Sequence, residues 1–153
     1  MDSLLQKSVS TELEDLIQYI NKCQFDDLTL YRKISNTFGQ LAALFGGFNN
    51  NAVSRKDEIK NACIAFNNAF KHQREMKEDY NNLKLITYGT ALDCILPAPL
   101  GDVVYLTNSD YLKKLRNPRN YEWYSKVFEG KRLDFILYEI KQILGEEKWV
   151  NTM

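Results

Sequence analysis

Residues 54–72 have the sequence SRKDEIKNACIAFNNAFKH, and this stretch decides the fold. Its apolar residues recur at the three- and four-residue spacing of one helix face, namely Ile59, Ala62, Cys63, Phe66 and Phe70. Ser54 is a good N-cap, and Asp57 is a weak capping-box partner three residues later. The stretch therefore predicts a helix that starts near Ser54, and we expect it to run to about Tyr80, just before two consecutive asparagines.

Further amphipathic segments lie on both sides of this stretch. Helical spacing of apolar residues predicts helices over residues 3–22, 27–45, 111–115, 121–128 and 132–144. Asp26 or Asp27 is expected to cap the second of these helices, which Gly46-Gly47 then ends, and Gly145 is expected to end the last. Ser109 is expected to cap the short helix, and Asn117-Pro118 to break it.

Between the helices, short runs rich in β-branched and aromatic residues are separated by glycine and proline. They predict strands over residues 83–88, 91–96 and 103–107, which form a small antiparallel hairpin or three-stranded sheet. The fold class that follows is mainly α, a helical bundle with a small sheet near residues 83–107. We expect residues 1–153 to form a single domain.

Composition narrows the class of protein. Hydrophobic residues make up 44% of the chain, which argues against disorder, and 20 basic residues balance 20 acidic ones. The three cysteines have no metal-binding spacing, no glycine-rich phosphate loop is present, and neither a metal nor a cofactor is expected. Residues 1–10 do not resemble a secretory signal and no apolar run suits a membrane span, so we expect a soluble, cytoplasmic protein.

His72 is the only histidine, and histidine is the side chain best suited to proton transfer near neutral pH. On an ideal helix it is rotated by about 200° from Phe70, so it faces away from the apolar stripe. Asn68 and Glu75 share its face, which leaves it in solvent, against the strands or in a subunit interface. Two interpretations are open: an ordinary surface histidine beside an acidic residue, or a polar site. In such a site Glu75 orients His72, and Lys71 or Arg74 attracts an anionic substrate.

The six residues Asn67-Asn68-Ala69-Phe70-Lys71-His72 resemble the signature of HEPN domains, which are helical proteins of prokaryotic toxin–antitoxin and phage-defence systems. That signature has an arginine, a polar residue that is often asparagine, a few more residues and then histidine. Five positions match, but Asn67 stands where the arginine is expected. The segment with Gly89, Asp93, Pro97 and Pro99 is also similar to Abi-like relatives.

The resemblance implies a homodimer that cuts RNA without a metal, the 2′-hydroxyl attacking the adjacent phosphate. His72 would be the acid–base group, with Asn68, Lys71, Arg74 and Glu75 as supporting catalytic residues. Asn67 carries no charge and is too short to bind the phosphate as an arginine does. The resemblance therefore implies a degenerate ribonuclease or a protein that binds RNA without cutting it.

A second candidate site is the basic and aromatic segment from residue 111 to residue 132. Its candidate binding residues for a nucleic acid or a partner protein are Lys113, Lys114, Arg116, Arg119, Tyr121 and Trp123. Basic residues interleaved with aromatics follow a phosphate backbone and stack on bases, but the same pattern suits a solvated helix pair whose aromatics pack on the sheet.

The leading expectation is thus a HEPN-like protein of a conflict system that binds RNA or a partner protein. The alternative is a non-enzymatic interaction protein: an antitoxin, an immunity factor or a viral inhibitor of a defence complex. The loss of the motif arginine favours this alternative, in which His72 has no chemical role.

Overall fold

The computed structural model of this chain describes residues 3–22, 24–72, 86–90, 102–107 and 110–146. Its elements are α1 (Ser3–Asn21), α2 (Asp27–Phe45), α3 (Arg55–Lys71), β1 (Ile86–Thr90), β2 (Asp102–Leu106), the 3-10 helix η1 (Asp110–Lys114), α4 (Arg119–Val127) and α5 (Leu133–Glu146). The described part is mainly helical, which confirms the predicted fold class.

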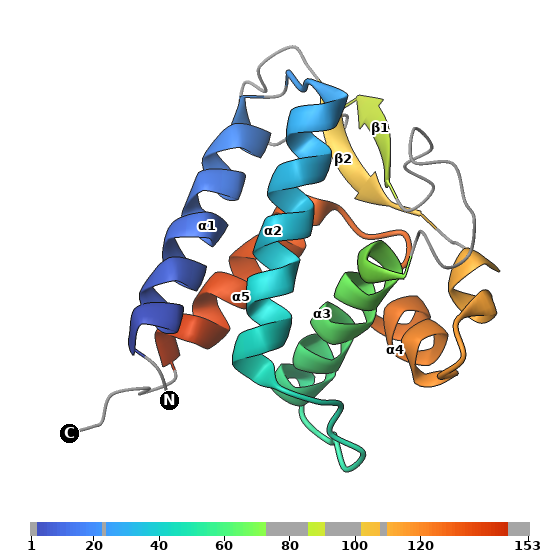
Figure 1. Cartoon of the computed structure of the whole chain (residues 1–153). Coiled ribbons are helices and arrows are strands. Elements are labelled where there is room, and N and C mark those ends of the chain that lie inside the picture. The colour runs from blue at the N-terminus through green and yellow to red at the C-terminus, as the bar shows by residue number, and fades with distance from the viewer. Residues whose placement is uncertain (1–2, 23, 73–85, 91–101, 108–109, 147–153) are drawn as a thin grey trace.

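The helices α1 to α4 pack in sequence order, each against the next, and α5 packs on α1 and β2 (Figure 1). The strands β1 and β2 pair antiparallel, with Ile86 opposite Leu106 and Thr90 opposite Asp102. They correspond to the first and third predicted strands, and the second predicted strand, over 91–96, lies outside the described residues.

Capping residues set the helix starts as the sequence predicts. The Asp26 carboxylate accepts a hydrogen bond from the Thr29 backbone N–H at 2.9 Å, so Asp26, rather than Asp27, caps α2. Ser54 Oγ accepts from the Asp57 N–H at 3.1 Å and caps α3. Gly46 ends α2 with a φ of 84°, a left-handed conformation that costs glycine little.

Two predicted helix ends are wrong. The helix α3 ends at Lys71 rather than near Tyr80, and His72 follows it as the C-cap, because the stripe that packs the helix ends at Phe70. Residues 73–80 of the predicted helix lie outside the described residues. Gly145 does not stop α5, which continues to Glu146, since a glycine inside a helix costs only about 1 kcal/mol relative to alanine.

Phe66 of α3 lies at the centre of the core. It is fully buried, and its ring contacts those of Phe38 on α2 at 4.8 Å and Phe70 at 5.0 Å between centroids. On the other side it contacts Tyr124 of α4 at 5.8 Å and Phe128, the C-cap of α4, at 6.0 Å. These distances are typical of favourable aromatic pairs, so one ring of α3 links the N-terminal helices to α4.

The loop between α4 and α5 pairs with the end of β2. Gly130, with a φ of 76°, donates its N–H to the Leu106 carbonyl at 2.8 Å, and the Leu106 N–H donates to the Lys131 carbonyl at 2.8 Å. The buried guanidinium of Arg132 pairs with Asp134 at 2.7 Å at the start of α5. These contacts fix the loop between α4 and α5 against the end of β2.

Substitution Phe66→Ala should lower the free energy of unfolding by about 3–5 kcal/mol, because it removes a fully buried ring and leaves a cavity. The matched control is Phe135→Ala on α5, where the side chain is 58% exposed and the decrease should stay below about 1 kcal/mol. Urea denaturation followed by circular dichroism measures both. Equal decreases would contradict the central place of Phe66.

Candidate functional site

The face of α3 that carries Asn68 and His72 is covered by α4. Ala65 and Ala69, which share that face, have no exposed surface. The sequence predicts this face in solvent, against the strands or in a subunit interface, and the structure adds a contact with α4 through Asn68. The helix α3 therefore packs against both α2 and α4.

Asn68 makes the contact that joins the two predicted sites. Its Nδ2 donates a hydrogen bond to Oδ1 of Asn120 at 2.8 Å, across 52 residues of chain. Asn120 is 4% exposed and donates its own Nδ2 to the Asn117 carbonyl at 3.0 Å. A buried amide whose donor and acceptor groups are both paired holds a fixed position. The C-terminal end of α3 is therefore fixed beside the start of α4.

His72 lies at this end of α3, partly buried, and its backbone N–H donates to the Asn68 carbonyl at 3.0 Å. Lys71 next to it is exposed. Arg74 and Glu75, the other predicted members of the site, lie outside the described residues. Among the predicted catalytic residues, Asn68 is hydrogen-bonded to Asn120 of α4. This contact suits a residue that positions the helices rather than one that contacts a substrate.

Asn67, at the position of the motif arginine, faces a different helix from Asn68. A methyl group built on Gly39 of α2 would lie 3.6 Å from Asn67 Oδ1, an ordinary contact distance. The amide of Asn67 thus lies in the contact between α2 and α3. Asn67 therefore supplies no positive charge beside His72, and any such charge comes from a different residue.

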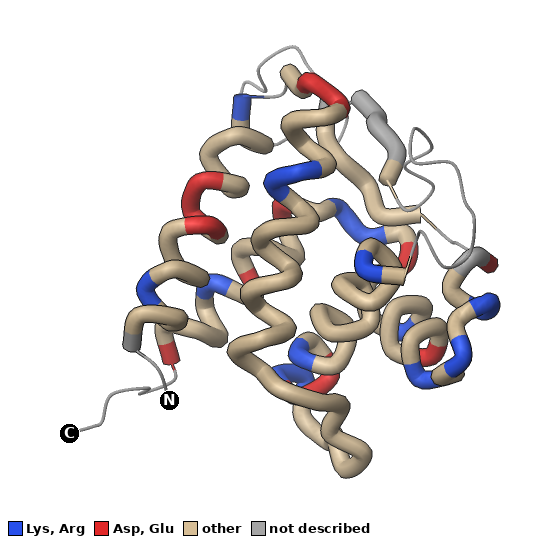
Figure 2. The backbone as a smooth tube through the Cα atoms, viewed as in Figure 1, with Lys and Arg blue, Asp and Glu red and all other residues tan. Residues whose placement is uncertain are grey.

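The basic part of the second predicted site is exposed. Lys113, Lys114 and Arg116 are exposed, Arg119 is partly exposed, and Figure 2 shows blue segments along η1 and at the start of α4. The Asn117 side chain accepts from the Arg119 backbone N–H at 3.0 Å and helps to fix the turn before α4.

We call the side chains of this region the junction surface. It consists of Lys71, His72, Lys113, Lys114, Arg116 and Arg119.

The aromatic part of that site is largely buried, which corrects one prediction. Trp123 is 5% exposed and lies under the ammonium of Lys126, 5.1 Å from the ring centroid, so it is not placed to stack on a base. Tyr124 donates its hydroxyl to the Thr107 carbonyl at 2.5 Å. Burial, with a smaller effect from the charge of Glu129, raises the pKa of Tyr124 above its ordinary value. These rings belong to the core because they form the inner face of α4.

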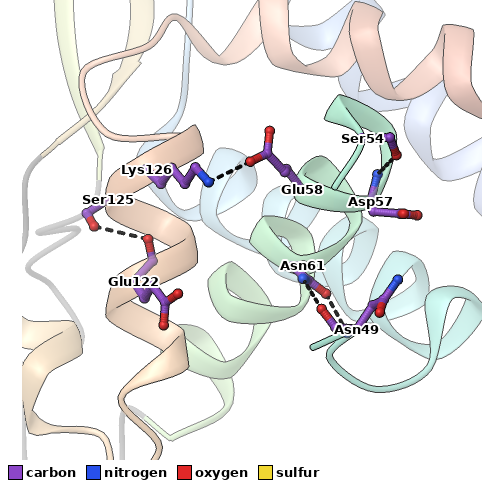
Figure 3. Close-up of polar contacts among 8 residues, drawn as sticks. All are labelled: Asn49, Ser54, Asp57, Glu58, Asn61, Glu122, Ser125 and Lys126. Atoms are coloured by element: carbon purple, nitrogen blue, oxygen red, sulfur yellow. Dashed lines mark hydrogen bonds and ion pairs between the residues drawn. The ribbon is translucent and has the colours of Figure 1, made fainter. Parts of the chain in front are cut away.

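A second polar pair holds the other end of α4 against α3, and sequence reasoning missed it. Lys126 Nζ lies 2.7 Å from a Glu58 carboxylate oxygen (Figure 3).

The side chain of Asn61 closes the loop between α2 and α3. Asn61 is buried and exchanges two hydrogen bonds with the backbone of Asn49, at 2.8 and 2.9 Å (Figure 3). Asn61 precedes Asn68 by seven residues, two helical turns, so polar residues recurring on one face of α3 were the available signal.

Within the described part of the chain, no three His, Cys, Asp or Glu side chains are grouped as a metal site would require. Cys63 is buried in the core, and burial raises the pKa of its thiol above the ordinary value. Of the helices that the structure describes, none combines the length and the apolar character needed to cross a membrane.

In comparisons with known proteins, no protein family, curated protein or solved structure matches this chain. The functional inference therefore rests on the site itself.

Substitution Asn68→Ala should destabilise the fold by about 1–3 kcal/mol, because the buried Oδ1 of Asn120 is left without its donor. The matched control Asn36→Ala, at an exposed position of α2, should change stability by less than about 0.5 kcal/mol. In a double-mutant cycle with Asn120→Ala, the two effects should not add. Additive effects would show that the two amides do not depend on each other.

Proposed function

We propose that this chain is a HEPN-like RNA-binding protein of a prokaryotic toxin–antitoxin or phage-defence system, and that RNA binds at the junction surface. The hydrogen bond between Asn68 and Asn120 carries the proposal. Two segments predicted separately, the motif of α3 and the basic segment of η1 and α4, lie together because of it. Such a surface offers a proton-transfer group at the end of α3 and exposed positive charges on η1 and at the start of α4.

Local charge supports RNA as the ligand. Residues 110–121 contain four basic residues and one acidic residue, Asp110, although the whole chain has a net charge of zero. A positive patch on a neutral protein attracts a polyanion at that patch rather than over the whole surface. Phosphate contacts of this kind release counterions, so binding should weaken steeply with salt.

Cleavage is a second candidate activity, and the partial exposure of His72 at the junction surface favours it. His72 would take the proton from a 2′-hydroxyl as that oxygen attacks the neighbouring phosphorus, the P–O5′ bond breaks, and the departing 5′-oxygen takes a proton from water. The developing negative charge needs a cation, which Asn67 does not supply. We expect Arg119 rather than Asn67 to supply this cation, because Arg119 is the first residue of α4 and directly precedes Asn120, the partner of Asn68.

Replacing Lys114 and Arg116 together by alanine should weaken binding of a short RNA several-fold. The slope of log affinity against log salt should become shallower by about 0.7 for each phosphate of a single strand that the variant no longer neutralises. Fluorescence anisotropy at several salt concentrations measures both quantities. The matched control is Lys7→Ala, at an exposed position of α1, a helix that packs on α2 and α5.

A wild-type protein that binds no RNA, or binds it with no salt dependence, would contradict the proposal. The chain would then be better described as an interaction protein that recognises another protein, such as an antitoxin or an inhibitor.

Incubation with RNA in the presence of a chelator tests the second activity. Wild-type protein should produce cleavage that His72→Ala abolishes, while the affinity of His72→Ala for RNA stays within about threefold because one partly buried ring is removed. Equal cleavage by both proteins would show that His72 is not the catalytic group, and no cleavage by either would leave RNA binding without catalysis.

A further inference from the structure

Among the aromatic residues of the basic segment whose burial the structure describes, Tyr121 is partly exposed. It lies on α4 and is partly buried, packed at the edge of the core, whereas Trp123, Tyr124 and Phe128 are buried. On α4, Tyr121 points about 100° away from Asn120, which faces α3. Its ring therefore lies to one side of the buried face of α4, beneath the ammonium of Lys113.

The ring of Tyr121 is paired with a lysine that an aspartate holds in place. Lys113 Nζ lies 4.7 Å from the ring centroid, and the same ammonium lies 3.1 Å from a carboxylate oxygen of Asp110. The hydrogen bond and charge of Asp110, with smaller effects from Tyr121, raise the pKa of Lys113 above its ordinary value. Lys113 therefore stays charged over the ring in the free protein.

Both sides of this pair are open to solvent. The side chain of Lys113 is 56% exposed and that of Asp110 is 83% exposed, so their ion pair is weak and screened by salt. An RNA phosphate, which also binds an ammonium, competes with Asp110 for Lys113. When the ammonium moves to a phosphate, the face of the ring that it covered becomes available to a base.

We propose that Tyr121 stacks on an unpaired base of the bound RNA, with Lys113 moving from the ring to the adjacent phosphate. This inference rests on the proposed function and adds the kind of RNA and the residue that selects it. Bases in a duplex already stack on each other and hide their faces, whereas an unpaired base can turn outward onto an aromatic ring. The junction surface should thus prefer single-stranded to double-stranded RNA.

The test compares a single-stranded RNA of about 12 nucleotides with a duplex of the same sequence, using the full chain. Tyr121→Leu keeps an apolar side chain at the core edge but removes the ring, and it should lower affinity for the single strand roughly 5- to 150-fold. Affinity for the duplex should change less than about twofold. The salt slope should not change, because no charge is removed.

Two further variants separate stacking from a loss of fold or charge. Tyr121→Phe keeps the ring and should bind the single strand as the wild type does. Lys113→Ala should reduce the salt slope while keeping the preference for the single strand. Thermal unfolding of each variant checks that the fold is retained.

Equal weakening of both RNAs in Tyr121→Leu, or no weakening of either, would overturn the stacking role while leaving RNA binding intact. Wild-type protein that binds neither RNA would overturn the proposed function, and the stacking role with it.

Discussion

The packing of α3 between two helices is the constraint on which the rest of the described structure depends. Its phenylalanines lie in the aromatic core, and its polar residues Asn68 and Glu58 contact α4. Phe66 contacts rings from both sides, so the two halves of the chain share one aromatic cluster. A helix covered on opposite sides has few solvated positions, and each polar side chain on it needs a specific partner.

Those polar side chains set the position of α4. Asn68 pairs with Asn120 near one end of α4, and Glu58 pairs with Lys126 near the other. Apolar packing alone tolerates sliding of one helix along another, because dispersion contacts are not directional. Two polar contacts about ten residues apart on α3 define the register, and the buried amide pair is the more sensitive to substitution because water cannot replace its partner.

This register has a functional consequence. The end of α3 that carries His72 and Lys71 lies beside the start of α4, and α4 in turn contacts η1, where exposed basic residues are found. Residues that fix the fold, such as Asn68 and Asn120, are thus distinct from residues that are accessible to a ligand. The aromatic residues divide in the same way: Trp123 and Tyr124 stabilise the core, and Tyr121 remains at the surface.

The sequence by itself determined the helices, because their apolar spacing, their N-caps at Asp26 and Ser54 and the glycine after Phe45 act over a few residues. It also located the basic segment and the motif around His72. Only the tertiary structure decided which face of α3 is covered, since periodicity identifies an apolar stripe but does not show that the polar face with Asn68 contacts a second helix. For the same reason the sequence did not show that Trp123 is buried while Tyr121 is partly exposed. Which aromatic ring is buried depends on how α4 is turned against α3, and contacts between residues more than fifty positions apart fix that rotation.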